Sequence, residues 1–233
     1  MSTLLLRLAA PLQSWGVDAK FDRRGTERLP TKSGVIGLVA AALGRRRNES
    51  LDDLSSLCFG VRVEREGALL RDFHIAKSVD DAYVTNRYYL SDAVFLVGLE
   101  GEYSTLTAIE HALRFPAFPL FLGRRSCPPE GQVSLGVRTG LPLLQALTEE
   151  PWLISEWAKG REAPEVHLRI VTDATSNTGY AVFQRDVPLS FDQQQRQYGF
   201  RRVHEHSAFP MTNPNSKRAL KHPITTHDAM AEL

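Results

Sequence analysis

Cysteine is scarce in this chain of 233 residues: Cys58 and Cys127 are the only two, and they lie far apart. Their spacing matches no common metal site, so we expect two free thiols and a reducing cytoplasm. Long apolar runs are also missing, and the sequence predicts no membrane-spanning helix. The apolar stretch from Leu4 to Leu6 is too short for a signal peptide and has no cationic lead, so it predicts a first strand.

The familiar catalytic and cofactor motifs are missing as well. The sequence has no phosphate-binding loop, no dinucleotide fingerprint, no zinc spacing of Cys and His, no two-metal pair of acids and no Gly-x-Ser-x-Gly elbow. His204 and His206 would share one face of a strand, but no third ligand can be named. Two partly exposed strand histidines are the simpler interpretation, and we expect neither a metal nor a cofactor.

An ordinary globular composition is combined with unevenly placed charge. Hydrophobic residues make up 42% and charged residues 24%, which is enough for a sizeable core. The net charge is only +1, yet residues 1–47 hold nine Lys or Arg against three acids, and residues 114–138 and 192–222 are basic too. Solvated loops would explain any one basic segment. Three of them favour a focused basic groove and an anionic partner.

The order of the expected elements predicts an α+β fold. The first 138 residues give strand, helix, strand, strand, helix, strand, which is the βαββαβ order of ferredoxin-like folds, shared by RNA-recognition domains. Thr31 is a good N-cap, Gly44 a good helix stop and Glu66-Gly67 a hairpin turn. The expected elements are a strand over Thr3–Ala9, a helix from Thr31 to Leu43, strands over Phe59–Arg65, Ala68–Ile75 and Ala93–Leu99, and a helix over Thr105–Phe115.

Two domains are expected along the chain. Residues 1–140 would form the ferredoxin-like domain, with a polar, aperiodic insertion near residues 77–90 that protrudes as a loop. Residues 141–233 would form a smaller, β-rich C-terminal domain. It would begin with a helix over Leu141–Ala158 and turn to strands from Glu165 onward.

The first candidate binding motif is the loop Gln13-Ser14-Trp15-Gly16 at the end of the first strand. It offers an amide, a hydroxyl and an indole, and its glycine lets another backbone approach closely. An indole can stack on an unpaired base, which is worth about 1–3 kcal/mol per base. A core tryptophan that closes the strand end is an equally good interpretation, so both stay open.

The second and third motifs are basic. Between Phe21 and Gly34, three arginines precede a helix start whose free backbone N–H groups suit a phosphate; a flexible loop before a capped helix is the plain alternative. The loop Gly123-Arg124-Arg125-Ser126 would form a phosphate or base clamp at a strand end. We expect the turns over residues 13–33 and 123–126 to converge into one cationic cradle for unpaired ribonucleotides.

Together these motifs resemble the CasD family, the 5′-handle subunit of type I-E CRISPR Cascade. The resemblance rests on Pro-Leu-Gln-Ser-Trp-Gly, Pro-Thr-Lys-Ser-Gly and Leu-Gly-Arg-Arg-Ser-Cys-Pro, and it extends to the segments Leu70–His74, Arg87–Ala93 and Arg185–Phe191. It covers most of the chain in the right order. It implies a RAMP-type protein that caps the 5′ handle of the guide RNA without chemistry and kinks the RNA with a projecting thumb. This sequence would place that thumb near residues 77–90.

The resemblance also implies partners and a set of contact residues. The partners are the CRISPR RNA 5′ handle, a CasC-type backbone subunit, a CasA-type large subunit and, through the complex, target DNA; no membrane, metal or cofactor is implied. The residues expected to bind phosphates, read base edges or stack are Gln13, Ser14, Trp15, Lys20, Arg23, Arg24, Arg28, Thr31, Lys32, Ser33, Arg124, Arg125, Ser126, Arg201, Arg202 and His204.

The alternative from another functional class is a metal-independent endoribonuclease. Related RAMP proteins cut repeat RNA through its 2′-hydroxyl, which needs a base, an acid and a cation near the scissile phosphate. The type I-E resemblance argues against cutting, because a separate subunit makes the handle there. A purely structural adaptor would leave the basic loops unexplained. The candidate catalytic residues, which no spacing joins into a triad, are His74, Tyr88, Tyr89, His204 and Lys217.

Overall fold

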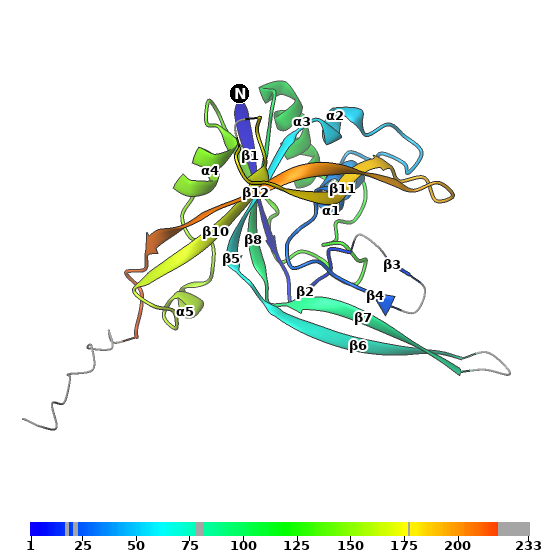
Figure 1. Cartoon of the computed structure of the whole chain (residues 1–233), viewed down its shortest axis with the longest axis horizontal. Helices are drawn as coiled ribbons and strands as arrows, with labels where there is room; N and C mark the ends of the chain where they lie inside the picture. The colour runs from blue at the N-terminus through cyan, green and yellow to red at the C-terminus, as the bar shows by residue number, and fades with distance from the viewer. Residues whose placement is uncertain (17–18, 21–22, 78–81, 177, 219–233) are drawn as a thin grey trace, which may run out of the picture.

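The computed structural model describes residues 1–16, 19–20, 23–77, 82–176 and 178–218. These residues form one large antiparallel sheet of seven strands, in the order β11-β12-β10-β5-β8-β1-β9 (Figure 1). The strands are β1 (Ser2–Ala9), β5 (Cys58–Arg65), β8 (Val94–Gly101), β9 (Ser134–Arg138), β10 (Glu165–Asp173), β11 (Val182–Ser190) and β12 (Gln197–Thr212).

The expected order of strand, helix, strand, strand, helix, strand is present in the first half of the chain. The chain passes from β1 to helix α1, through the short helix α2 to β5, then to β8, helix α3 and β9. The architecture therefore mixes helices with antiparallel strands, in agreement with the predicted α+β class. The helices are α1 (Lys32–Ala42), α2 (Asp52–Ser55), α3 (Tyr103–Arg114), α4 (Leu143–Glu149) and α5 (Glu156–Lys159).

Alternation along β1 divides the core between the two faces of the sheet. Leu4, Leu6 and Leu8 pack in the main core with buried side chains of α1 and α3. Leu5 points the other way and packs with Leu143 and other buried side chains of α4. Successive strand side chains alternate between faces, so a fully apolar strand must be covered on both sides. That requirement explains why the sheet has helices on each face.

The structure corrects the expected hairpin of Phe59–Arg65 with Ala68–Ile75. β5 has both edges occupied, by β8 and β10, so it has no edge left for the strand that follows it. Instead Ala68–Lys77 (β6) pairs with Ala82–Ser91 (β7), and the two form a long arm that projects from the body (Figure 1). Much of the expected loop near residues 77–90 is therefore strand β7, and residues 78–81 lie outside the described residues.

The C-terminal part of the chain extends the main sheet, since β10 pairs with β5 over Ile170–Thr172. The expected helix over Leu141–Ala158 is broken into α4 and α5. Arg62 of β5, which is fully buried, donates hydrogen bonds at 2.6–2.9 Å to three carbonyl oxygens at the end of α4. These belong to Leu147 within the helix and to Glu150 and Pro151 just after it. Such bonds satisfy carbonyls that a continuous helix would have used itself. No helix among the described residues is long and apolar enough to cross a membrane.

Candidate nucleic-acid interface

Two turns that are distant in sequence meet beside the N-terminus of α1. The Ser14 amide donates a hydrogen bond to the Leu122 carbonyl at 3.1 Å. Gly123 has a φ of 84° and lies so close to the Ser14 carbonyl that a Cβ there would collide with it. Only glycine combines that backbone conformation with that approach. The turns over residues 13–33 and 123–126 therefore lie together, as the sequence predicts.

Arg124 ties the meeting point together. Its guanidinium donates to the carbonyl oxygens of Tyr88 at 3.2 Å, Arg24 at 2.8 Å and Gly25 at 3.2 Å, and it lies 4.6 Å from the centre of the Tyr89 ring. These acceptors are neutral, so Arg124 keeps its full positive charge at the surface. The side chain fixes the loop geometry and contributes to the local potential at the same time.

A groove of about 1100 Å³ begins at this point and runs along α1. That volume slightly exceeds the range of about 300–1,000 Å³ for pockets that hold drug-sized ligands, so the groove has room for an extended ligand. No acidic side chain is among the described residues that line it. We call it the arginine groove, after its six lining arginines, Arg24, Arg45, Arg46, Arg47, Arg124 and Arg196.

The structure assigns Gln13 and Trp15 to the core. Trp15 is 1% exposed, and its indole N–H donates to Gln13 Oε1 at 3.1 Å. The amide of Gln13 in turn donates to the carbonyl oxygens of Leu8 and Ala93. Both side chains are fully occupied, so base reading by Gln13 and stacking by Trp15 are not possible in this conformation. The alternative of a core tryptophan describes Trp15 correctly.

Gly34 leaves space for the Trp15 ring and not for an approaching ligand. A Cβ at position 34 would lie 2.8 Å from Cε3 of Trp15, inside contact distance. The hydroxyls nearby are also used internally: Thr31 accepts from the Gly34 amide as the N-cap of α1, Ser33 bonds to Thr31, and Ser14 donates to the Tyr88 carbonyl. Ser14, Thr31 and Ser33 line the groove but are at most 5% exposed.

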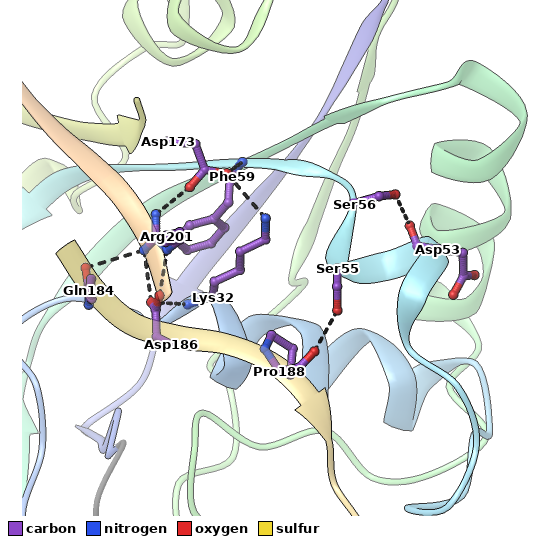
Figure 2. A network of polar contacts seen from close by, with 10 residues as sticks. All are labelled: Lys32, Asp53, Ser55, Ser56, Phe59, Asp173, Gln184, Asp186, Pro188 and Arg201. Atoms are coloured by element: carbon purple, nitrogen blue, oxygen red, sulfur yellow. Dashed lines mark hydrogen bonds and ion pairs between the residues drawn. The ribbon is translucent and has the colours of Figure 1, made fainter. Parts of the chain in front are cut away.

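Lys32 and Arg201, both expected to contact RNA, lie in a buried network of charges (Figure 2). Arg201 binds Asp186 through two hydrogen bonds, at 2.6 and 2.9 Å, and Asp173 at 2.6 Å. Lys32 donates its backbone N–H to Asp186 at 2.9 Å and its Nζ to Asp173 at 3.3 Å. The two cations and two carboxylates balance, so little charge remains for a ligand.

The protonation of Arg201 follows from the same contacts. Burial alone would lower the pKa of the Arg201 guanidinium, but the carboxylates of Asp186 and Asp173 outweigh burial and hold that pKa above its ordinary value. Arg201 therefore stays charged as a partner of these acids. Sequence patterns miss such a network because its members come from four separate elements.

Arg202 and His204 lie further along β12 and do not line the arginine groove. The exposed Arg202 donates to the Thr178 carbonyl at 3.4 Å, and Nδ1 of His204 lies 2.8 Å from the Tyr180 carbonyl oxygen. The His204 ring packs edge-on against His206 with centroids 4.6 Å apart. Among the described residues, no group of three or more His, Cys, Asp or Glu side chains is placed to hold a metal ion.

The remaining expected contacts divide into exposed residues and residues that are only partly described. Arg24 is exposed and lines the groove, whereas Arg28, Arg125 and Ser126 are exposed but do not line it. The backbones of Lys20 and Arg23 lie in the short strands β3 (Ala19–Lys20) and β4 (Arg23–Arg24), and their side chains lie outside the described residues. Four groove arginines were not among the expected RNA contacts: Arg45, Arg46, Arg47 and Arg196.

Comparisons with known proteins agree on one family. The family described as CRISPR-associated protein (Cas_Cas5) matches residues 3–204. The CRISPR system Cascade subunit CasD of Escherichia coli (strain K12) is 37% identical over 158 residues, which cover 58% of this chain and 70% of that protein. A solved structure described as a crystal structure of a Cas protein is 40% identical, with a TM-score of 0.68 over 93% of this chain and 98% of that one. A CRISPR RNA-guided surveillance complex contains a chain that is 32% identical, with a TM-score of 0.71 over 89% of this chain and 91% of that chain.

Proposed function

Since this chain belongs to the CRISPR-associated Cas5 protein family, we propose that it is a Cascade subunit that caps the 5′ handle of the CRISPR RNA. The observation that carries this proposal is the inner end of the arginine groove, where Arg24 and Arg124 line the depression beside two interlocked turns and no acidic side chain of the described residues lines it. Such a surface fits an extended, single-stranded polyanion.

Binding would begin at the two interlocked turns. Arg24 is exposed there, and Arg124 is held at the meeting point by three carbonyl contacts. The Arg124 charge is fixed before the RNA arrives, so little entropy of that side chain is lost on binding. The buried Gln13 and Trp15 shape this end of the groove from below and do not contact the ligand.

The fold supports the same assignment. We propose that β9-β1-β8-β5, with α1 and α3 on one face, is a ferredoxin-like unit of the RAMP type, because its antiparallel order 4-1-3-2 is that of a βαββαβ fold. The strands after residue 140 would be the smaller β-rich unit built onto its edge. The projecting β6–β7 arm would be the thumb that kinks the RNA where the handle meets the spacer.

The partners proposed for the assembled complex follow from this role. A CasC-type backbone subunit would continue along the guide RNA beyond the arm, and a CasA-type large subunit would lie beside the capped end. Target DNA would be contacted only through the complex.

The protein would act by binding and not by cutting RNA. A nuclease needs a base, an acid and a cation around one phosphate. His74 pairs with Asp72 on β6, and Tyr88 and Tyr89 lie on β7 of the same arm. His204 on β12 lies against the Tyr180 carbonyl, and Lys217 lies near Gly160 beside α5. His204 and Lys217 therefore lie apart from the three candidates on the arm, and no observation favours the endoribonuclease.

One experiment separates binding from cleavage. The purified full chain, and the assembled complex, are incubated with labelled repeat RNA in the presence of a chelator. We expect retention of the RNA without cleavage, and weaker retention for Arg24→Ala. Cleavage at a fixed site would instead establish the nuclease, and absence of binding in both preparations would refute the cap.

A further inference from the structure

The arginine groove continues well past the two turns that define its inner end. It follows α1 to the loop after that helix, where Arg46 and Arg47 line it. Arg196, which precedes β12, and Tyr198 within β12 line the same groove from the C-terminal part of the chain. We call these four residues the distal wall. Sequence reasoning placed none of them among the RNA contacts.

The positive charge of the distal wall is available to a ligand. Arg45 next to it is tied to Asp53 through both terminal nitrogens and to the Ser50 carbonyl at 2.9 Å. In contrast, within the part of the chain that the structure describes, the exposed side chains of Arg46, Arg47 and Arg196 form no ion pair and no hydrogen bond.

Acids near the distal wall do not cancel this charge. Glu49 accepts a hydrogen bond from the backbone N–H of Arg46 at 2.7 Å, and Asp192 accepts from the backbone N–H groups of Gln194 and Gln195. Both carboxylates are engaged by backbone amides, and neither lines the groove. An incoming anion therefore meets three arginines without a competing carboxylate on the groove wall.

The floor and sides of the groove fit a single strand. Ala40 and Ala41 of α1 line the floor with small side chains, whereas the Phe191 ring lies against Gly37, 3.5 Å from where a Cβ there would be. Phe191 and Tyr198 stand at the side as partly exposed rings on which bases can stack. This combination of cations, small residues and aromatic faces is typical of single-strand binding tracks.

Arginines after a helix also have a plainer role, because they offset the negative end of the helix dipole. That role accounts for Arg46 and Arg47. It does not account for Arg196, which comes from the C-terminal half of the chain and lines the same groove. Convergence of two separate basic segments on one acid-free wall indicates a ligand.

We propose that the distal wall is a second subsite for single-stranded RNA, continuous with the inner end of the groove. Arg46, Arg47 and Arg196 bind consecutive backbone phosphates, and Tyr198 stacks on a base between them. The inference rests on the proposed function, because it extends the path of the same RNA strand beyond Arg24.

A length series of RNA tests the subsite in the full chain. The probes are labelled oligouridylates of about 4 to about 16 nucleotides, the range of site sizes known for single-strand binding folds. The test variant is Arg46→Ala/Arg47→Ala/Arg196→Ala. The matched control, Arg114→Ala/Arg161→Ala/Arg218→Ala, removes the same charge from exposed positions outside the groove.

We expect wild-type affinity to rise with probe length until the track is full. The test variant should match wild type on the shortest probe and stop gaining affinity at a shorter length. On the longest probe, its slope of log affinity against log salt should fall by about 2, since each single-strand phosphate contact contributes about 0.7. The control variant should follow wild type throughout.

The failures are distinguishable. A test variant that follows wild type at every length overturns the distal subsite, and the proposed function stands if Arg24→Ala still weakens the shortest probe. An equal loss in the control also overturns the subsite, since net charge alone would then explain the effect. If neither the wild-type chain nor the assembled complex binds any probe, the proposed function itself fails. Equal melting temperatures, and a parallel Arg→Gln series, separate loss of binding from loss of fold.

Discussion

Replacing Asp186 by Asn removes one negative charge from the buried network at the start of α1 (Figure 2). Asp186 is 0% exposed and accepts two hydrogen bonds from Arg201 and one from the backbone of Lys32. Asn keeps one oxygen for these donors but turns N–H hydrogens toward the guanidinium. We expect a loss of about 3 kcal/mol, the lower end for breaking a buried pair, because Asp173 still balances Arg201.

For a chain of this size, that loss lowers the melting temperature by about 6–12 °C. Urea unfolding measures it directly, and the dependence of the free energy on urea should stay unchanged. Asp72→Asn is the control: its carboxylate is 42% exposed and, among the residues that the structure describes, pairs with His74 alone, so we expect a change within about 0.5 kcal/mol.

A double variant measures the coupling between Asp186 and Arg201. Asp186→Asn leaves part of the buried charge of Arg201 without a partner, and Arg201→Gln leaves the two buried carboxylates without theirs. Each single variant therefore includes the cost of an unpaired buried charge, and the other substitution removes that cost. The loss in the double variant should therefore be smaller than the sum of the two. A loss under about 1 kcal/mol for Asp186→Asn, or strict additivity, would refute a tightly coupled buried network.

Three further predictions concern packing, charge and pH. Gly34→Ala places a Cβ 2.8 Å from the ring of Trp15 and should cost about 1–3 kcal/mol in urea unfolding. Arg201→Gln should leave the salt dependence of RNA binding unchanged, whereas Arg24→Ala should lower its slope by about 0.7. Burial and a neighbouring histidine lower the pKa of His206, so the stability it contributes is present above about pH 6.5 and is lost as the pH falls. His206→Gln should flatten that loss in urea midpoints measured between about pH 8 and pH 5.

Each of these has an outcome that contradicts it. Gly25→Ala is the control for packing, since a Cβ there meets nothing within 4 Å; an equal cost at both glycines would remove contact with the indole as the cause. A lower slope for Arg201→Gln would mean that the charge network opens when RNA binds. An equally steep loss of stability in acid for His206→Gln would assign that loss to other groups.

The order of elements was predictable because its determinants are local. The cap at Thr31 is visible in the sequence, and the observed helix begins at the next residue. Gly44 and Gly67 have φ values of 77° and 72°, in the left-handed region that favours glycine, and each ends an element near its expected position. The meeting of the two basic turns was also predicted correctly, but from the three binding motifs taken together and not from any one of them.

Long-range pairings could not be predicted from the sequence. A short hairpin between β5 and β6 looks plausible because the turn at Gly67 is a good one. The pairing fails because β10, from the other half of the chain, occupies the edge that β6 would need. Likewise Lys32 looks like a phosphate contact until Asp173 and Asp186, which lie far along the chain, are placed beside it. Both errors have the same physical cause, which is competition by distant partners for a single edge or charge.

The polar motif residues therefore divide by burial into two kinds. Gln13, Thr31 and Ser33 are buried, and their hydrogen bonds fix the shape of the inner end of the groove. The exposed arginines around them have few internal partners and provide the charge. A buried polar group that loses its partner costs about 1–3 kcal/mol, whereas an exposed one costs little. Substitution of the buried set should consequently disturb the fold before it changes recognition, and substitution of the exposed set should change recognition alone.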